Sequence, residues 1–333
     1  MALGINACVA ALRITREQAV AYRLQVNNLT HRLPAGSAVE AAHFGLQDTA
    51  PRDALLGLHA RVTDTGPDDW QHPGLIQSYA PRRAVYVLPQ QNLGVFTRGC
   101  LPYDDAERAA IEADAEDICR QLDGREVKGA AVIGNRRSAC WTGRIALRWT
   151  TSAIFVREVP EPEIDLHAAR QLLCLLHLRA FAPATPQSYA WWTDSGRRDA
   201  ERTWASIADR LIELDYEGRQ AWALAEDEDT LRDPQEPVGV RLLVPSDLRL
   251  LGRDRLGLFV GPGLLPLSDL HDSFHPGGVL ADGRIVGAWG RSGGAVDVRI
   301  ARSIPRRLVR VIDEEATTMP IPGARMSVVI NRC

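Results

Sequence analysis

Lysine is almost absent from this chain of 333 residues. Of its 39 basic residues, Lys128 is the only lysine, and every other one is an arginine. Chemistry that begins with a lysine amine forming a Schiff base therefore has a single candidate. Guanidinium groups, in contrast, bind phosphate oxygens through two parallel hydrogen bonds, so the arginines suit a phosphate-bearing partner.

Long apolar runs and clustered metal ligands are also missing. No stretch of eighteen apolar residues occurs, so the sequence predicts no membrane-spanning helix. The six cysteines are scattered without a CxxC pair, which disfavours a zinc site and a disulfide framework. The eight histidines show no HExxH spacing, and neither a GK[ST] phosphate loop nor a GxSxG elbow is present. We expect a protein that needs no metal and no cofactor.

The opening residues, MALGINACVAALRIT, lack the basic segment and long apolar stretch of a secretory signal. Together with the scattered cysteines, this leads us to expect a reduced, cytoplasmic protein.

Charge is unevenly distributed along the chain. The net charge is −3 and the isoelectric point is about 6.3, which argues against a surface coated for nucleic acid. However, segments 136–157 and 299–310 each hold five arginines and no acid, whereas acids concentrate at 104–117 and 226–236. Two interpretations stay open: an ordinary mixed surface, or local basic surfaces that bind phosphate.

One order of elements, helices followed by a short β element, occurs three times along the first 235 residues. In the first occurrence, Thr15 is a suitable cap for a helix over 14–29. A second helix is expected from Pro51, and strands are expected over 82–89 and 92–99.

The second occurrence has a helix over 104–124, stopped by Gly124. A helix end and a strand are expected within 140–160.

The third occurrence is the clearest. Helices are expected over 167–183, 185–195 and 199–218, and a strand over 219–227. Three helices followed by a strand hairpin is the order of a winged helix-turn-helix unit, in which a recognition helix docks to DNA and a wing flanks it. An acidic, proline-containing linker at 226–237 then leads into a β-rich region, where Asp282-Gly283 predicts a hairpin turn.

Gln47, Asp48 and Thr49 stand together just before the helix expected from Pro51. One interpretation is a helix cap, because Asp and Thr favour that position and Pro is welcome in the first turn. Capping does not explain Gln47, which follows the apolar Leu46. An amide beside a carboxylate is also what holds a water molecule in one orientation.

Several stretches resemble one family, the AlkZ-like winged-helix DNA glycosylases. They are GLQDTAPRDALLGLHAR at 45–61, LRAFAPATPQSYAWW at 178–192, LLVPSDLRLLGRDR at 242–255 and GGVLADGRIVGAW at 277–289. The resemblance runs through nearly the whole chain, with the motifs in the family's order. It implies an α+β fold of three tandem winged helix-turn-helix units and a C-terminal β-rich region, together forming a C-shaped, concave DNA-binding surface. The boundaries that we predict are 1–100, 101–160, 161–235 and 236–333.

The resemblance also implies the catalytic residues. The family's motif is Gln, a residue that is usually apolar, and then Gln or Asp; here it falls on Gln47, Asp48 and Thr49. Gln47 matches, but Thr49 stands where a second amide or an acid is expected, and the acid stands in the middle. Either Gln47 and Thr49 hold the water together, or Asp48 supplies the charge.

The implied substrate is double-stranded DNA that carries a bulky N7-alkylguanine. Such a base is cationic, so its glycosidic bond is already weak and no acid is needed to protonate it. The enzyme then needs a held water and stabilisation of the sugar's oxocarbenium character. Because Lys128 lies far along the chain, we expect monofunctional hydrolysis, and the resemblance implies self-resistance to a genotoxic natural product.

DNA contacts are expected from arginines, and the protein is expected to act as a monomer without a membrane partner. The candidates are Arg52, Arg136, Arg137, Arg144, Arg148, Arg299, Arg302, Arg306 and Arg307. The alternative is a winged-helix DNA-binding protein or regulator without catalysis, which the departure at Thr49 favours.

Overall fold

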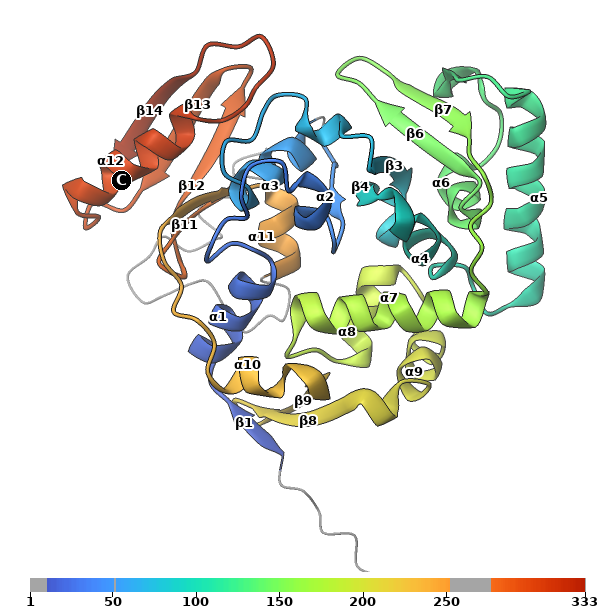
Figure 1. Ribbon diagram of the computed structural model, residues 1–333, viewed down its shortest axis with the longest axis horizontal. Helices are drawn as coiled ribbons and strands as arrows, with labels where there is room; N and C mark the ends of the chain where they lie inside the picture. The colour runs from blue at the N-terminus through green and yellow to red at the C-terminus, as the bar shows by residue number, and fades with distance from the viewer. Residues whose placement is uncertain (1–10, 51, 252–276, 333) are drawn as a thin grey trace, which may run out of the picture.

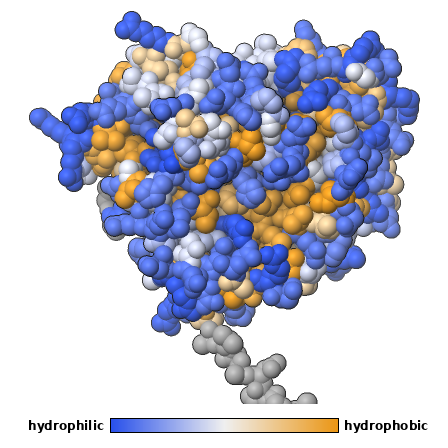
Figure 2. All heavy atoms as spheres, viewed as in Figure 1, coloured by the Kyte–Doolittle hydropathy of each residue, from blue (hydrophilic) through white to orange (hydrophobic). Residues whose placement is uncertain are grey.

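The computed structural model describes residues 11–50, 52–251 and 277–332 as a mixed α+β fold (Figure 1). Its strands form three sheets, of six, three and five strands. Among the described residues, no helix is long and apolar enough to cross a membrane. Figure 2 shows one face on which hydrophilic side chains dominate and apolar ones gather towards the middle.

The six-stranded sheet has the order β2-β4-β3-β6-β7-β5, and all its pairings are antiparallel. Its strands are β2 (Leu46–Gln47), β3 (Leu75–Tyr79), β4 (Val85–Pro89), β5 (Val127–Lys128), β6 (Ile145–Trp149) and β7 (Ile154–Glu158). The helices that accompany it are α2 (Ala38–Ala41), α3 (Asp53–Arg61), α4 (Leu93–Arg98), α5 (Asp105–Leu122) and α6 (Arg136–Ala139). The sheet therefore joins the segments that we assigned to the first and second units.

The three-stranded sheet pairs two strands that lie far apart in the sequence. Strand β1 (Leu12–Ile14) runs parallel to β8 (Leu211–Tyr216), which pairs antiparallel with β9 (Arg219–Leu224). The elements around it are α1 (Arg16–Val26), α7 (Leu166–Phe181), α8 (Pro186–Thr193), α9 (Arg197–Ala205) and α10 (Glu228–Arg232). Phe96 of α4, Leu173 of α7 and Trp192 of α8 belong to one buried cluster. Helices α7 and α8 therefore share a core with α4, which accompanies the six-stranded sheet.

The five-stranded sheet has the order β10-β11-β12-β13-β14. Its elements are β10 (Val240–Leu243), α11 (Pro245–Leu251), β11 (Gly277–Ala281), β12 (Arg284–Ser292), β13 (Ala295–Ile300), α12 (Arg306–Thr317) and β14 (Ser327–Arg332). Figure 1 places this sheet and the β6–β7 hairpin on opposite sides of α3.

Local signals in the sequence account for several boundaries. Thr15 is the N-cap of α1, as predicted, and it forms a capping box with Gln18. Asp104 caps α5, and the chain leaves that helix through the left-handed Asp123 and Gly124. The predicted Asp282-Gly283 turn joins β11 to β12, and both residues have positive φ, as a type I′ turn requires.

Two expectations about local structure were wrong. Residues 92–99 form α4 instead of a strand, because Leu93, Phe96 and Cys100 recur at helical spacing and bury one face. The helix expected up to Gly218 ends at Ala205.

The segment after that boundary is a strand because it pairs with the strand that follows it. Residues 211–216 alternate in burial and pair with β9 across a turn in which Glu217 and Gly218 both have positive φ. The β-rich stretch from Val240 is interrupted by α11, which begins at Pro245, a residue favoured in the first helical turn. The linker at 226–237 likewise contains α10.

Candidate active site

The predicted motif lies at the edge of the six-stranded sheet, on the segment that leads from β2 into α3. Gln47 pairs with Tyr86 of β4, and the Asp48 N–H continues the ladder by donating to the Val85 carbonyl at 2.8 Å. Gly45 precedes β2 with φ of +77°, and a Cβ there would stand 2.9 Å from Tyr86. Only glycine fits this entry, which places the motif tightly against β4.

Asp48 is fully buried and caps α3. Its Oδ1 accepts from the Ala54 N–H at 3.0 Å, and its Oδ2 accepts from Nε2 of Gln77 at 2.9 Å. Burial raises the pKa of Asp48 to about 6, against the lowering effect of hydrogen bonds from backbone N–H groups, that of Ala54 first. Both oxygens are already used, so the geometry favours a supporting role for Asp48 over direct proton transfer.

Gln47 is also buried, with 7% of its surface exposed. Its Nε2 donates to the Thr49 hydroxyl, whereas its Oε1 is buried and accepts no hydrogen bond from the described residues. Thr49 is exposed. Because the Thr49 oxygen already accepts from Gln47, its own proton stays available as a donor. A buried acceptor and an exposed donor therefore stand side by side, the pair that a single oriented water requires.

Arg52 has a strained backbone conformation at the start of α3, and its side chain is fixed by stacking and a hydrogen bond. Its φ of +81° is left-handed, a conformation that stores on the order of 1–3 kcal/mol in a non-glycine residue. Its guanidinium carbon lies 3.9 Å from the centre of the Trp70 ring, and Nη1 donates to the Trp149 carbonyl at 3.3 Å. The predicted DNA-binding Arg52 is thus fixed beside the motif.

Asp53 is a site residue that sequence reasoning missed. Its Oδ2 accepts from the Ala50 N–H at 3.2 Å, and burial, followed by the nearby Asp48 and Asp247 carboxyls, raises its pKa to about 6. Arg291 of β12 opposes this rise. Gln77, Trp70, Trp149 and Arg291 were missed as well, because they come from four separate elements and no local pattern in the sequence connects them to the motif.

The other predicted arginines lie in two groups on opposite sides of α3 (Figure 1). One group is on α6 and β6: Arg148 stacks on Phe155 and pairs with Glu126, and Arg144 pairs with Glu158. Arg136 and Arg137 lie on α6 in the same group, and Arg137 is exposed.

The second group extends from the end of β13 to the first turn of α12. Arg299 lies 3.4 Å from Asp297, and Arg302, Arg306 and Arg307 are exposed. The structure therefore does not gather all the arginines into one patch.

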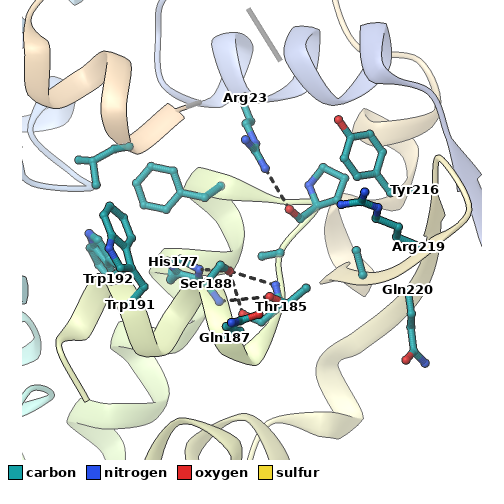
Figure 3. A pocket seen from close by; sticks show the side chains of 15 residues that line it. Arg23, His177, Thr185, Gln187, Ser188, Trp191, Trp192, Tyr216, Arg219 and Gln220 are labelled. Carbon is teal, nitrogen blue, oxygen red and sulfur yellow. Dashed lines mark hydrogen bonds between the residues drawn. The ribbon is translucent and has the colours of Figure 1, made fainter. Parts of the chain in front are cut away.

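A pocket of about 530 Å³ lies elsewhere, between α1, α7, α8 and the β8–β9 hairpin (Figure 3). None of the motif residues lines it. His177 and Ser188 meet there at 3.0 Å, but the Ser188 hydroxyl donates to the Thr185 carbonyl and belongs to the cap of α8. Its proton is therefore not directed towards His177, and this pair is no activated nucleophile. In the part of the chain that the structure describes, no group of three metal-ligating side chains occurs.

Comparison with known proteins gives consistent matches. A family model described as "DNA glycosylase AlkZ-like" matches residues 120–319. The chain is 30% identical over 138 residues to the interstrand DNA cross-link repair glycosylase of Streptomyces sahachiroi, a match that covers 40% of this chain and 36% of that protein. The structure of Streptomyces sahachiroi DNA glycosylase AlkZ superposes with a TM-score of 0.73 and 20% identity, covering 96% of this chain and all of that one. The fold is thus shared over nearly the whole length.

The buried Asp53 predicts a pH-dependent stability. Its folded pKa of about 6 lies above the unfolded value of about 4, so its favourable contribution is complete below pH 4 and is lost as pH rises through 6. Asp53→Asn removes this titration and keeps an oxygen for the Ala50 N–H. The variant should therefore gain stability relative to the parent between pH 4 and pH 7, by up to about 3 kcal/mol.

Urea denaturation at pH 4.5 and pH 7.5 measures this difference. Glu163→Gln, at an exposed carboxylate, is the matched control and should show a much smaller pH-dependent change. A stability difference for Asp53→Asn that is the same at both pH values would contradict the prediction.

Proposed function

Because the chain belongs to the AlkZ-like DNA glycosylase family, we propose that it hydrolyses the N-glycosidic bond of bulky N7-alkylguanine adducts in duplex DNA. The observation that carries this proposal is the Gln47 amide, which donates to Thr49 and keeps a buried, unpartnered oxygen. The matching fold and the cross-link repair glycosylase activity named for the Streptomyces sahachiroi relative support the same conclusion.

Gln47 and Thr49 hold the attacking water in this proposal. The Gln47 Oε1 accepts one hydrogen of the water, and the Thr49 hydroxyl donates to the water's oxygen. A second lone pair on that oxygen then points at the anomeric carbon as the bond to the base lengthens. Fixed dipoles of this kind need no reorganisation during the reaction, which is where their catalytic effect arises.

The substrate's own charge drives the departure of the base. A cationic N7-alkylguanine leaves as a neutral base when the C1′–N9 bond breaks. The water oxygen forms the new bond to C1′ and then loses its extra proton to bulk water. No general acid is required. The carboxyl of Asp53 provides negative charge near the oxocarbenium-like sugar without a covalent step.

The hydrolysis is monofunctional and independent of metals and cofactors in this proposal. Lys128, which is exposed on β5, is the chain's only lysine, and it lies in a different part of the sheet from β2. The supporting argument is therefore the position of the one amine that could form a Schiff base.

DNA is gripped on both sides of the lesion. The arginines of α6 and β6 lie on one side of α3 and those of β13 and α12 on the other, which supports a concave, C-shaped surface built from three winged helix-turn-helix units. Contacts of this kind go mainly to phosphates and carry little sequence information. The protein acts as a monomer, because a single chain supplies both flanks.

The biological setting that fits such an activity is self-resistance in the cytoplasm of a cell that makes a genotoxic natural product. Support comes from the family resemblance and from the cross-link repair activity named for the Streptomyces sahachiroi relative.

Thr49 supports a second candidate function, a winged-helix DNA-binding protein or regulator without catalysis. A threonine hydroxyl is neither the amide nor the acid expected at this position, and the region matched by the family model begins after the motif. Heating alkylated DNA in alkali after incubation separates the two: strand breaks report base release, whereas a shifted but intact band reports binding alone.

Substrate scope tests the proposed reaction. Three duplexes of one sequence carry a bulky intercalating N7-guanine adduct, N7-methylguanine or uracil. We expect fast release of the bulky adduct, slower release of the methylated base and none of uracil or unmodified guanine, because a bulky adduct unwinds the duplex and its shape can be read. Release of uracil would sink the proposal, since uracil leaves as an anion and needs an extrusion pocket.

Gln47→Ala tests the water-holding role. The variant should release the bulky adduct at least about 10²-fold more slowly with nearly unchanged DNA affinity, because general-base-type assistance contributes about 10²–10⁴-fold. Gln91→Ala, at an exposed amide that follows β4, is the control. Wild-type rates for Gln47→Ala in a single-turnover assay would remove Gln47 from the mechanism.

Arg306 and Arg307 test the second DNA-binding flank. Reversing both to Glu should weaken binding to every DNA sequence alike and flatten the dependence of affinity on salt, because phosphate contacts release counterions. Fluorescence anisotropy at several salt concentrations measures both effects. If affinity is unchanged at low salt, this arginine run is an ordinary solvated surface.

A further inference from the structure

Gln77 connects three distant segments of the chain through one buried amide. It lies on β3 with 6% of its surface exposed. Its Nε2 donates to Oδ2 of Asp48 at 2.9 Å, and its Oε1 accepts from the Trp149 N–H at 2.7 Å. Asp48 belongs to the motif, and Trp149 is the last residue of β6 before the turn to β7. One side chain thus joins the motif to the β6–β7 hairpin.

The polarity of this connection is fixed at both ends. The Trp149 N–H is a donor, so the amide oxygen of Gln77 must face it. The amide nitrogen is then directed at Asp48, whose other oxygen accepts from the Ala54 N–H at 3.0 Å. Reversing the amide would set two donors against each other at Trp149. A buried donor without an acceptor is unfavourable, because it has lost its hydrogen bonds to water without replacement. We call the chain of hydrogen bonds from the Trp149 N–H through Gln77 to Asp48 and the Ala54 N–H the relay. Each group in the relay is fixed as either a donor or an acceptor.

A second hydrogen bond also connects Trp149 to the segment that carries the motif. The Trp149 carbonyl accepts from Nη1 of Arg52 at 3.3 Å, and Arg52 lies on the connection that follows the motif. The N–H of Trp149 is thus connected to Asp48 through Gln77, and its C=O binds Arg52 directly. The stacking of Arg52 on Trp70 limits the freedom of the second attachment.

We propose that Gln77 is a positioning residue that keeps the Gln47 amide and the Thr49 hydroxyl in register with the β6–β7 hairpin, acting through Asp48. The proposal rests on the proposed function of Gln47 and Thr49. Gln77 touches neither the water nor the DNA; it fixes the segment that carries the residues that do. The acid in the middle of the motif, where the family resemblance leads one to expect an apolar residue, is explained as the acceptor for this amide.

Exchanging the two side-chain types tests the relay. Gln77→Glu sets two carboxylates against each other, and Asp48→Asn sets two amide donors against each other. The double variant Asp48→Asn with Gln77→Glu restores complementarity with reversed polarity. In it, the new amide at position 48 still accepts from the Ala54 N–H and donates to the new carboxylate at position 77, which still accepts from the Trp149 N–H.

The rate of base release from the bulky adduct under single-turnover conditions is the first measurement. Each single variant should lose at least 10-fold in this rate while its DNA dissociation constant stays within 3-fold of the parent's. The double variant should return to within 3-fold of the parent's rate. Gln91→Glu, which places the same substitution at an exposed glutamine, is the control and should change neither quantity.

Hydrogen exchange of the Trp149 amide is the second measurement, and it does not depend on activity. Exchange should be at least 10-fold faster in each single variant and near the parent's rate in the double variant. If a single variant fails to fold, folding of the double variant with slow exchange gives the same support.

The outcomes separate the relay from the proposed function. A parent protein that releases no adduct, but whose exchange follows the expected pattern, overturns the proposed function and the catalytic part of this inference, and leaves the structural link. No rescue of exchange in the double variant overturns the link itself. Rescued exchange without rescued base release shows that the link is structural only and refutes a positioning role.

Discussion

Asp48 exchanges full hydration for hydrogen bonds from the Ala54 N–H and the Gln77 amide, and the geometry of the candidate site depends on that exchange. A buried carboxylate without donors would be strongly unfavourable, so the chain around it has to present an N–H and an amide at hydrogen-bonding distance. The first requirement fixes where α3 begins. The second fixes how β3 and the β6–β7 hairpin stand relative to the motif. Gln47 and Thr49 flank Asp48 in sequence, so their positions follow from its constraints.

The chemistry assigned to the site agrees with this division of roles. Asp48 has no unused oxygen, whereas Gln47 keeps one buried acceptor, and Thr49 keeps a donor. A weakly activated water is sufficient for a leaving group that departs as a neutral base. The loss of catalytic assistance caused by Thr49, in place of an acid or amide, is therefore smaller than it would be for an uncharged substrate base. In the proposed mechanism, the acid in the middle of the motif fixes the local structure, and the two residues on either side of it hold the attacking water.

The sequence predicted what depends on neighbouring residues. The Thr15 N-cap, the end of α5 and the Asp282-Gly283 turn are local signals, and the structure confirms them. Residues 92–99 were assigned wrongly because α7, which packs against their buried face, lies far along the chain. Residues 206–218 were assigned wrongly because their apolar residues also fit a helical pattern, and the tight turn at Glu217 and Gly218 that pairs them with β9 was not recognised. For the site the limit is the same. Gln47 could be proposed from a motif, but Gln77 and Arg291 reach the site from β3 and β12, and only the tertiary fold brings them there.

The parallel pairing of β1 with β8 has a consequence for the order of events during synthesis. Leu12 pairs with Leu214, so the first described strand has no partner until about two hundred further residues have left the ribosome. At about 5–20 residues per second, that interval is on the order of 10–40 seconds. The six-stranded sheet, whose strands all lie before residue 159, can assemble while β1 is still unpaired. In that order of events, the sheet edge that carries the candidate site forms before β1 docks onto β8.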